Sequence, residues 1–138
     1  MRIAIVDDLA KERASLHLQL GQILNLRSVC AEILEYESGE AFLAAEKEQQ
    51  FTAAFLDIYM DGMSGMDAAR ELRKMDTDCM LVFTTTSTDH ALEGFQVRAM
   101  HYLVKPFSAE ELERLTDEML VRMPYPDKCM VLKVDGSD

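Results

Sequence analysis

Long apolar segments are missing from this sequence. No run approaches the roughly 20 residues that a membrane-spanning helix needs. The N-terminal apolar stretch meets Asp7 and Asp8 too early to form the core of a signal peptide. The three cysteines lack the spacing of metal ligands, and we interpret them as reduced thiols. We therefore expect a cytoplasmic protein that does not enter a membrane.

Positive charge is scarce as well. The chain holds 14 Lys and Arg against 25 Asp and Glu, which gives a formal net charge of −11. A surface this acidic repels phosphate backbones, so we do not expect the chain alone to bind nucleic acid. What the sequence does have is 138 residues, 49% of them hydrophobic, which is enough for one domain with a substantial core.

Short apolar runs alternate with segments of helical periodicity. The apolar runs predict strands at 3–6, 29–37, 51–57, 80–83 and 100–104. The helical pattern covers 9–24, 39–48, 64–75, 89–96 and 108–123. Apolar and acidic residues alternate near the end of 29–37, which is typical of an edge strand or a half-exposed one. This alternation of strands and helices indicates βαβ units, and hence an α/β fold with a parallel sheet.

The run at 51–57 is the one most typical of a buried parallel strand. Its residues are mostly apolar, and a carboxylate, Asp57, comes only at the carboxyl end. Gly62 and Gly65 follow in a loop that is free to adopt positive φ. Because ligands of open α/β sheets bind outside the carboxyl ends of the strands, Asp57 is placed for chemistry.

Four predicted strands end in polar side chains that we expect to converge at one edge of the sheet. These side chains are Asp7 and Asp8, Asp57, Thr85, and Lys105. Three carboxylates brought together raise one another's pKa, and a hard cation such as Mg²⁺ relieves their repulsion. An ammonium and a hydroxyl beside them suit a phosphoryl group, which an aspartate can accept covalently.

Each of these residues also has an ordinary interpretation. Asp8 would serve as a helix cap, Thr85 as part of a turn, and Lys105 as a surface lysine before a helix-starting proline. Their occurrence together, each at the end of an apolar run, favours the phosphoryl site.

With these residues in place, the sequence resembles a response-regulator receiver domain of the CheY-like kind over residues 1 to about 123. The resemblance implies a flavodoxin-like fold, a doubly wound, five-stranded parallel sheet in the order 2-1-3-4-5 with helices on both faces. The motifs that carry it are Val6-Asp7-Asp8, Leu56-Asp57-Ile58-Tyr59-Met60, Gly65, Phe83-Thr84-Thr85-Thr86 and Tyr102-Leu103-Val104-Lys105-Pro106-Phe107.

The resemblance also implies how the site works. Asp57 would accept a phosphoryl group from a sensor histidine kinase, and Mg²⁺ would be held by Asp7, Asp8, Asp57 and the backbone carbonyl of Tyr59. The phosphate oxygens would be bound by Thr85, Lys105 and the backbone amides near Ile58 and Thr86. The Lys105–Pro106 peptide bond would be cis, as is usual in this family.

A switch between Thr85 and Tyr102 follows from the same resemblance. Phosphate at Asp57 would draw the Thr85 hydroxyl inward, and Tyr102 would turn in behind it. The surface of the fourth helix, last strand and last helix would repack and favour a homodimer. The alternative interpretation of Tyr102 is an ordinary half-buried aromatic residue.

Two positions depart from the family pattern. Asp61 stands where the family usually has proline, and His90 stands where receivers attached to LytTR-type DNA-binding domains usually carry tyrosine. The segment 89–103 otherwise resembles that subfamily. We expect a receiver domain at 1–123, followed at 124–138 by a linker and the start of a truncated LytTR-type domain. The alternative for 124–138 is a flexible C-terminus.

Other functions remain as alternatives at this point. A phosphohydrolase of the haloacid-dehalogenase type also uses an aspartyl nucleophile after a strand, but it needs a second acid two residues later, where this sequence has Tyr59. A stand-alone receiver that acts through protein–protein contacts is the other alternative. We expect a phosphoryl acceptor, not an enzyme, that at most catalyses its own phosphorylation and dephosphorylation.

Overall fold

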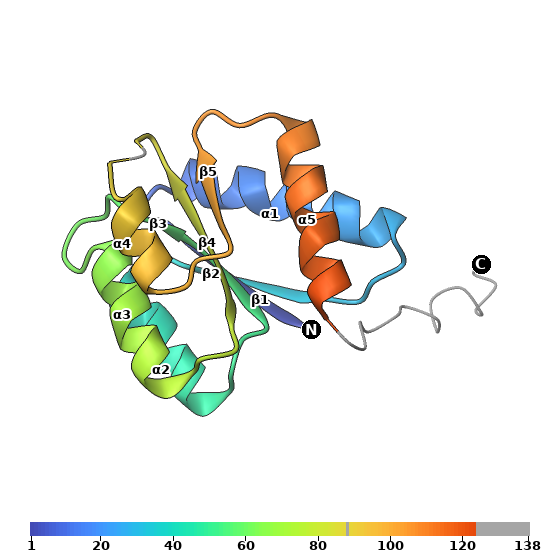
Figure 1. Ribbon diagram of the computed structural model, residues 1–138. Coiled ribbons are helices and arrows are strands. Elements are labelled where there is room, and N and C mark those ends of the chain that lie inside the picture. The colour runs from blue at the N-terminus through green and yellow to red at the C-terminus, as the bar shows by residue number, and fades with distance from the viewer. Residues whose placement is uncertain (88, 124–138) are drawn as a thin grey trace.

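A computed structural model places five parallel strands in one sheet with helices on both faces (Figure 1), and it describes residues 1–87 and 89–123. The strand order is β2-β1-β3-β4-β5, which confirms the predicted order 2-1-3-4-5. The strands are β1 (Arg2–Val6), β2 (Glu32–Tyr36), β3 (Ala53–Asp57), β4 (Met80–Thr85) and β5 (His101–Val104).

The helices divide between the two faces of the sheet. Helices α1 and α5 cover one face, and α2, α3 and α4 cover the other (Figure 1). Their bounds are α1 (Ala10–Leu26), α2 (Gly39–Glu48), α3 (Gly65–Met75), α4 (Ala91–Gln96) and α5 (Ala109–Arg122). The predicted linker and start of a second domain at 124–138 lie outside the described residues. No helix in the described part is both long and apolar enough to cross a bilayer.

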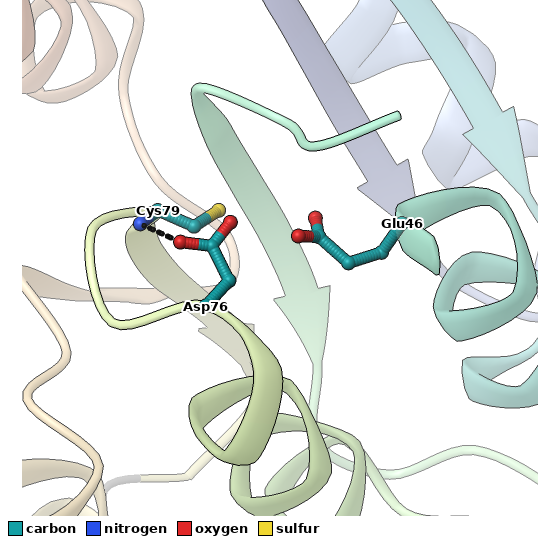
Figure 2. A group of neighbouring side chains, drawn as sticks. All are labelled: Glu46, Asp76 and Cys79. Carbon is teal, nitrogen blue, oxygen red and sulfur yellow. Dashed lines mark hydrogen bonds between the residues drawn. The ribbon is translucent and has the colours of Figure 1, made fainter. Parts of the chain in front are cut away.

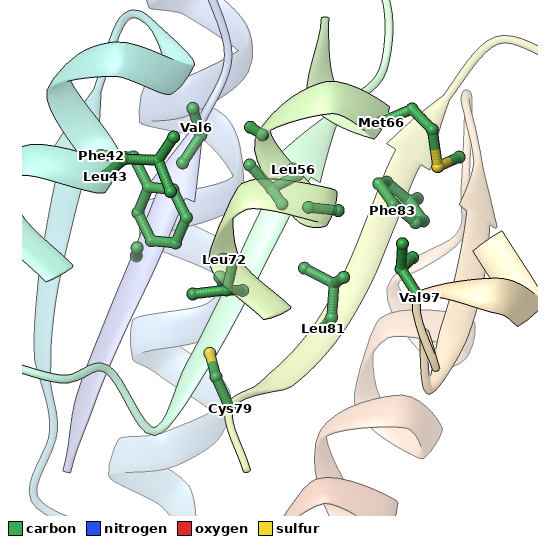
Figure 3. Close-up of a cluster of buried hydrophobic side chains, with 14 of the residues drawn as sticks. Val6, Phe42, Leu43, Leu56, Met66, Leu72, Cys79, Leu81, Phe83 and Val97 are labelled. Atoms are coloured by element: carbon green, nitrogen blue, oxygen red, sulfur yellow. The ribbon is translucent and has the colours of Figure 1, made fainter. Parts of the chain in front are cut away.

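The central strand β3 is buried along its whole length, because helices cover both of its faces. Successive side chains alternate between the faces. Leu56 packs among the residues of α2 and α3 (Figure 3), and Phe55 packs in the second core beneath α1 and α5. Asp57 continues this alternation at the point where the strand leaves the core.

Helix α5 closes the second core. Its buried residues Leu112, Leu115 and Met119 pack in the same cluster as the apolar face of α1. At the end of α1, Arg27 donates to Glu113 at 2.6 Å and to Asp117 at 2.9 Å, both on α5. Helices α1 and α5 are therefore joined by apolar packing and by ion pairs.

Local signals set the starts of two helices as expected. Ser64 accepts a hydrogen bond from the amide of Asp67, and Ser108 forms a reciprocal capping box with Glu111. Strand β2 is a half-exposed edge strand, as predicted, but it is shorter than 29–37 because pairing with β1 covers only residues 32–36. Helix α4 likewise begins at Ala91, two residues later than predicted.

The cysteines only partly match the prediction of reduced thiols. Cys79 is a free, buried thiol. Cys30 is disulfide-bonded, so the prediction is wrong there. Cysteine spacing alone does not reveal which thiols meet in the fold.

Candidate functional site

The carboxyl edge of the sheet brings four of the predicted polar residues together. Lys105, just after β5, donates to Asp7 Oδ2 at 2.8 Å, and its Nζ lies 3.8 Å from Asp57 Oδ2. Carboxylate oxygens of Asp7, Asp8 and Asp57 lie within 4.8 Å of one another. The sequence-based interpretation of Lys105 as a plain surface lysine is therefore wrong, and the predicted convergence is confirmed for Asp7, Asp8, Asp57 and Lys105.

Asp8 is held by a residue that departs from the family pattern. Its Oδ2 accepts a hydrogen bond from the backbone amide of Asp61 at 3.0 Å. A proline at position 61 has no N–H and cannot make this bond. Asp8 does not cap α1: the N-cap residue is Leu9, whose amide donates to Asp7 Oδ1 at 2.9 Å. The departure at position 61 thus ties the loop after β3 to the acidic cluster.

Asp57 is 5% exposed and lies among like charges. Burial raises its pKa to about 6; the Lys105 ammonium opposes this, and the carboxylates of Asp7 and Asp8 add to it. The amide of Tyr59 donates to Asp57 Oδ1 at 3.4 Å. With Asp7 and Asp8 already charged, ionisation of Asp57 is therefore unfavourable unless a cation offsets the added negative charge.

The ammonium of Lys105 is fixed as a cation. Burial lowers its pKa, but the hydrogen bond to Asp7 and the charges of Asp57, Asp7 and Glu12 outweigh burial, so the net pKa is raised. Glu12 lies 3.4 Å from Lys105 Nζ. Sequence reasoning missed Glu12, because an acid in the first turn of a helix is an ordinary dipole partner.

Two glycines shape the loop after Asp57 for different reasons. Gly62 has φ of +77°, as expected. Gly65 is needed instead for close approach, since a Cβ there would overlap the backbone carbonyl of Asp57. Its amide donates to the carbonyl of Ile58 at 2.9 Å. The close approach of Gly65 to Asp57 and its hydrogen bond to Ile58 hold the start of α3 directly against the end of β3.

The two threonines at the end of β4 face opposite sides of the sheet. Thr84 pairs in register with Asp57 and lines a small cavity of about 30 Å³ with Asp7, Glu12 and Lys105. Thr85 alternates to the other face. Its hydroxyl accepts from the amide of Ser87 at 3.3 Å, and within residues 1–87 and 89–123 it makes no hydrogen bond to Asp57. Sequence reasoning did not select Thr84, because only register reveals its side.

The remaining predicted site residues flank the acidic cluster. Ile58 is buried and Thr86 is exposed, and both follow directly after strand ends. The Tyr59 side chain is 47% exposed and packs edge-on against His90, with ring centroids 5.6 Å apart. The Lys105–Pro106 peptide bond is cis, as the resemblance implied.

Tyr102 is packed inward behind β4. Its ring lies 5.5 Å from that of Phe83, and its hydroxyl is buried without a hydrogen-bond partner among the described residues. Burial raises the pKa of Tyr102 to about 12. Gly94 makes room for the ring, because a Cβ there would lie 2.6 Å from Tyr102 Cε2. This close approach explains why α4 contains a glycine.

A divalent oxygen-binding cation fits this cluster chemically. Three carboxylates converge on one point, and their mutual repulsion persists despite the lysine. Hard oxygen ligands of this kind suit Mg²⁺, which commonly takes one or two carboxylates together with waters and a phosphate.

This fold and this site define a receiver domain of two-component response regulators. The response regulator receiver domain family matches residues 3–117, and the chain belongs to that family.

The curated relatives come from longer regulators. The chain is 34% identical over 116 residues to the sensory transduction protein LytT of Bacillus subtilis, covering 83% of this chain and 46% of the relative. It is 32% identical over 104 residues to LytT of Oceanobacillus iheyensis, covering 69% of this chain and 42% of the relative. The chain therefore spans less than half the length of these relatives.

Solved structures give the same fold. The response regulator TrrA from Thermotoga maritima, in complex with Mg²⁺-BeF, is 29% identical with a TM-score of 0.73, covering 86% of this chain and 97% of that one. The response regulatory domain of MrkE from Klebsiella pneumoniae matches with a TM-score of 0.75 at 23% identity, over 88% and 96% of the two chains.

Proposed function

We propose that Asp57 accepts a phosphoryl group from a phosphohistidine of a sensor histidine kinase. The observation that carries this proposal is the position of the Lys105 ammonium, which contacts Asp7 at 2.8 Å and lies 3.8 Å from the buried Asp57 carboxylate. A buried nucleophile beside a fixed cation is suited to a dianionic group, because phosphoryl transfer mainly requires positioning and charge neutralisation.

In the transfer step, an oxygen of the Asp57 carboxylate forms a bond to phosphorus. The N–P bond of the kinase phosphohistidine breaks, and the imidazole retains the bonding electrons and takes up a proton. The acceptor must be ionised, and Lys105 favours that form. Burial of Asp57 keeps bulk water away from the acyl phosphate that results.

The proposal assigns Mg²⁺ to Asp7, Asp8, Asp57 and the backbone carbonyl of Tyr59. The ion supplies positive charge that offsets the three carboxylates and the phosphate. Support comes from the cluster of carboxylate oxygens within 4.8 Å and from the TrrA neighbour, which was solved with Mg²⁺-BeF.

Lys105, Thr85 and the backbone amides of Ile58 and Thr86 complete the proposed phosphate site. Thr85 would have to exchange its contact with the Ser87 amide for one with the phosphate. That exchange would alter the packing behind β4, where Tyr102 lies against Phe83. We propose Thr85 and Tyr102 as the switch pair on these grounds.

The proposed output is a homodimer formed through α4, β5 and α5. Large apolar side chains lie exposed on this surface, with Leu92 and Phe95 on α4 at 76% and 80% exposure. Val104 on β5 and Val121 on α5 are exposed as well. Apolar residues gathered in this way mark a protein-interaction surface.

A transcriptional role is part of the proposal. It assigns residues 1–123 to the receiver and 124–138 to a linker and the start of a LytTR-type DNA-binding domain. The relatives named LytT support this, as does a match at 30% identity to the transcriptional regulatory protein RprY of Bacteroides fragilis. The chain acts as an acceptor and not as a phosphohydrolase, since Tyr59 occupies the place of the second acid.

Incubation with acetyl phosphate and Mg²⁺, read by intact mass, tests the acceptor. We expect uptake of one phosphoryl group by the parent protein and by the surface control Glu48→Gln, and none by Asp57→Asn. Uptake that survives Asp57→Asn refutes the proposal.

The switch is tested separately with Tyr102→Ala. We expect this variant to be phosphorylated like the parent but to lose phosphate-dependent dimerisation, measured by light scattering. Equal dimerisation in the two proteins would remove Tyr102 from the mechanism.

A further inference from the structure

A second cluster of ligand-type side chains lies at the opposite edge of the sheet from Asp57. Glu46 comes from the last turn of α2, Asp76 ends α3, and Cys79 precedes β4. Figure 2 shows the Glu46 carboxylate directed toward the Asp76 carboxylate and the Cys79 thiol. The three residues are 2%, 6% and 3% exposed, so water does not solvate their charges.

Backbone amides hold one oxygen of each carboxylate and leave the other to face the cluster. Glu46 Oε1 accepts from the amide of Phe51 at 3.1 Å. Asp76 Oδ1 accepts from the amides of Asp78 at 2.9 Å and Cys79 at 3.1 Å. Glu46 Oε2 is buried and has no hydrogen-bond partner among the described residues.

This arrangement is incomplete in electrostatic terms. Burial and a hydrogen bond shared with Asp76 raise the pKa of Glu46 to about 7, so at lower pH a proton joins the two carboxylates. Once both are ionised, the two facing oxygens are both acceptors and neither satisfies the other. A buried polar group without a partner costs roughly 1–3 kcal/mol, and more when it is charged. A cation between the oxygens would supply the partner that Glu46 Oε2 lacks.

We propose that Glu46, Asp76 and Cys79 form a second metal site that binds Zn²⁺ through two carboxylate oxygens and a thiolate. A thiolate ligand favours a borderline-soft ion such as Zn²⁺ over Mg²⁺. The Cys79 thiol loses its proton to solvent when the zinc–sulfur bond forms. Two carboxylates and one thiolate carry three negative charges, so a net charge of −1 remains once Zn²⁺ is bound.

Arg73 is placed to balance that remaining charge. It donates to the backbone carbonyl of Cys79 at 2.8 Å and to that of Asp76 at 3.3 Å. The guanidinium therefore lies beside the two residues that would ligate the metal, and the site as a whole would be neutral. The residual cost of burying charge is smallest in that state.

The geometry is close to a zinc site. One ligand atom from each residue lies within 4.8 Å of the others. Zinc bonds of about 2.0–2.3 Å place tetrahedral ligands roughly 3.3–3.7 Å apart, so closure needs side-chain movement of about 1 Å. A cavity of about 680 Å³, lined in part by Asp76 and Cys79, lies beside the cluster.

Cobalt is a suitable probe, since Co²⁺ bound to a thiolate absorbs in the near ultraviolet. With excess Mg²⁺ present to fill the Asp57 site, we expect one equivalent of Co²⁺ to develop this band and Zn²⁺ to abolish it. Cys79→Ser should remove the band. Glu46→Gln, which keeps the size of the side chain, should weaken Zn²⁺ binding by more than the roughly 10–100-fold typical of losing an outer-shell partner.

A matched control separates this site from adventitious binding. Glu48→Gln removes an exposed carboxylate from the same helix as Glu46 and should keep the band. Absence of the band in the parent protein overturns the proposal, as does its persistence in Cys79→Ser. If Cys79→Ser fails to fold by circular dichroism, Glu46→Gln decides: unchanged Zn²⁺ affinity in that variant overturns the proposal.

Discussion

Replacing Asp57 with Asn tests how strongly the acidic cluster resists its own charge. In the metal-free folded protein, burial raises the pKa of Asp57 to about 6, against an ordinary value of 3.8 for an unfolded chain. This difference corresponds to about 3 kcal/mol of lost folding stability once the residue is ionised in both states. An asparagine cannot ionise, so we expect the variant to be more stable by about this amount at pH 7 to 8.

The sign of the pH dependence follows from the raised pKa. Below pH 3.8 Asp57 is protonated in both states and contributes no penalty. Between about pH 4 and 6 the unfolded chain releases its proton while the folded protein retains it, so stability falls as pH rises. Above about pH 6 the penalty is constant. The advantage of Asp57→Asn should therefore grow from near zero at pH 4 to its full value by pH 7.

Urea unfolding in EDTA, followed by circular dichroism at half-unit pH steps, measures this difference. Burial also raises the pKa of Glu46, to about 7, but Glu46 is present in both proteins and its titration cancels in the comparison. Glu48→Gln serves as a control for the loss of an exposed carboxylate and should follow the parent protein. If the difference in unfolding free energy between the parent protein and Asp57→Asn does not change with pH, the pKa of Asp57 is not raised in the folded protein.

Three further outcomes follow from the site and its surroundings. Millimolar Mg²⁺ should raise the Tm of the parent protein, EDTA should reverse the rise, and Asp8→Asn should remove most of it, since the ion binds only the native cluster. Gly94→Ala should displace the Tyr102 ring, so an ultraviolet titration should show the phenol pKa falling from about 12 toward 10, with stability changed by about 1 kcal/mol at most. Gly65→Ala should abolish cooperative unfolding in calorimetry or lower Tm severely, because its Cβ overlaps backbone that cannot move away.

Much of the fold follows from patterns that are local in the sequence. The apolar run ending in Asp57 predicted a fully buried strand, and β3 is buried at every residue. The helical pattern beginning at Ser108 predicted the start of α5 correctly, and Ser108 is its N-cap. Strand and helix ends were less accurate: sequence reasoning extended β2 back to Val29, because apolar character continues beyond the residues that pair with β1.

The site was predictable as a set of strand ends but not as a set of contacts. Parallel strands deliver Asp7, Asp57 and Lys105 to one edge whatever the register. Register and pleat decide the rest. They place Thr84 beside Asp7 and Lys105 in the small cavity and Thr85 on the other face of the sheet, which no spacing rule reveals. The bond from the Asp61 amide to Asp8 likewise depends on how the loop after β3 folds back. The assigned roles of these residues, the domain boundary near 123 and the cytoplasmic location stay predictions.

The 14-residue helix α5 has a consequence for synthesis of the protein. A nascent chain that has left the ribosome as far as β5 carries every strand of the sheet, yet α1 alone shields the face lined by Ile5 and Phe55. At that stage Arg27 also lacks its acidic partners Glu113 and Asp117, which lie on α5. Stable folding of this domain during translation is therefore delayed until helix α5 emerges, and until then the half-covered sheet is open to chaperones and to aggregation.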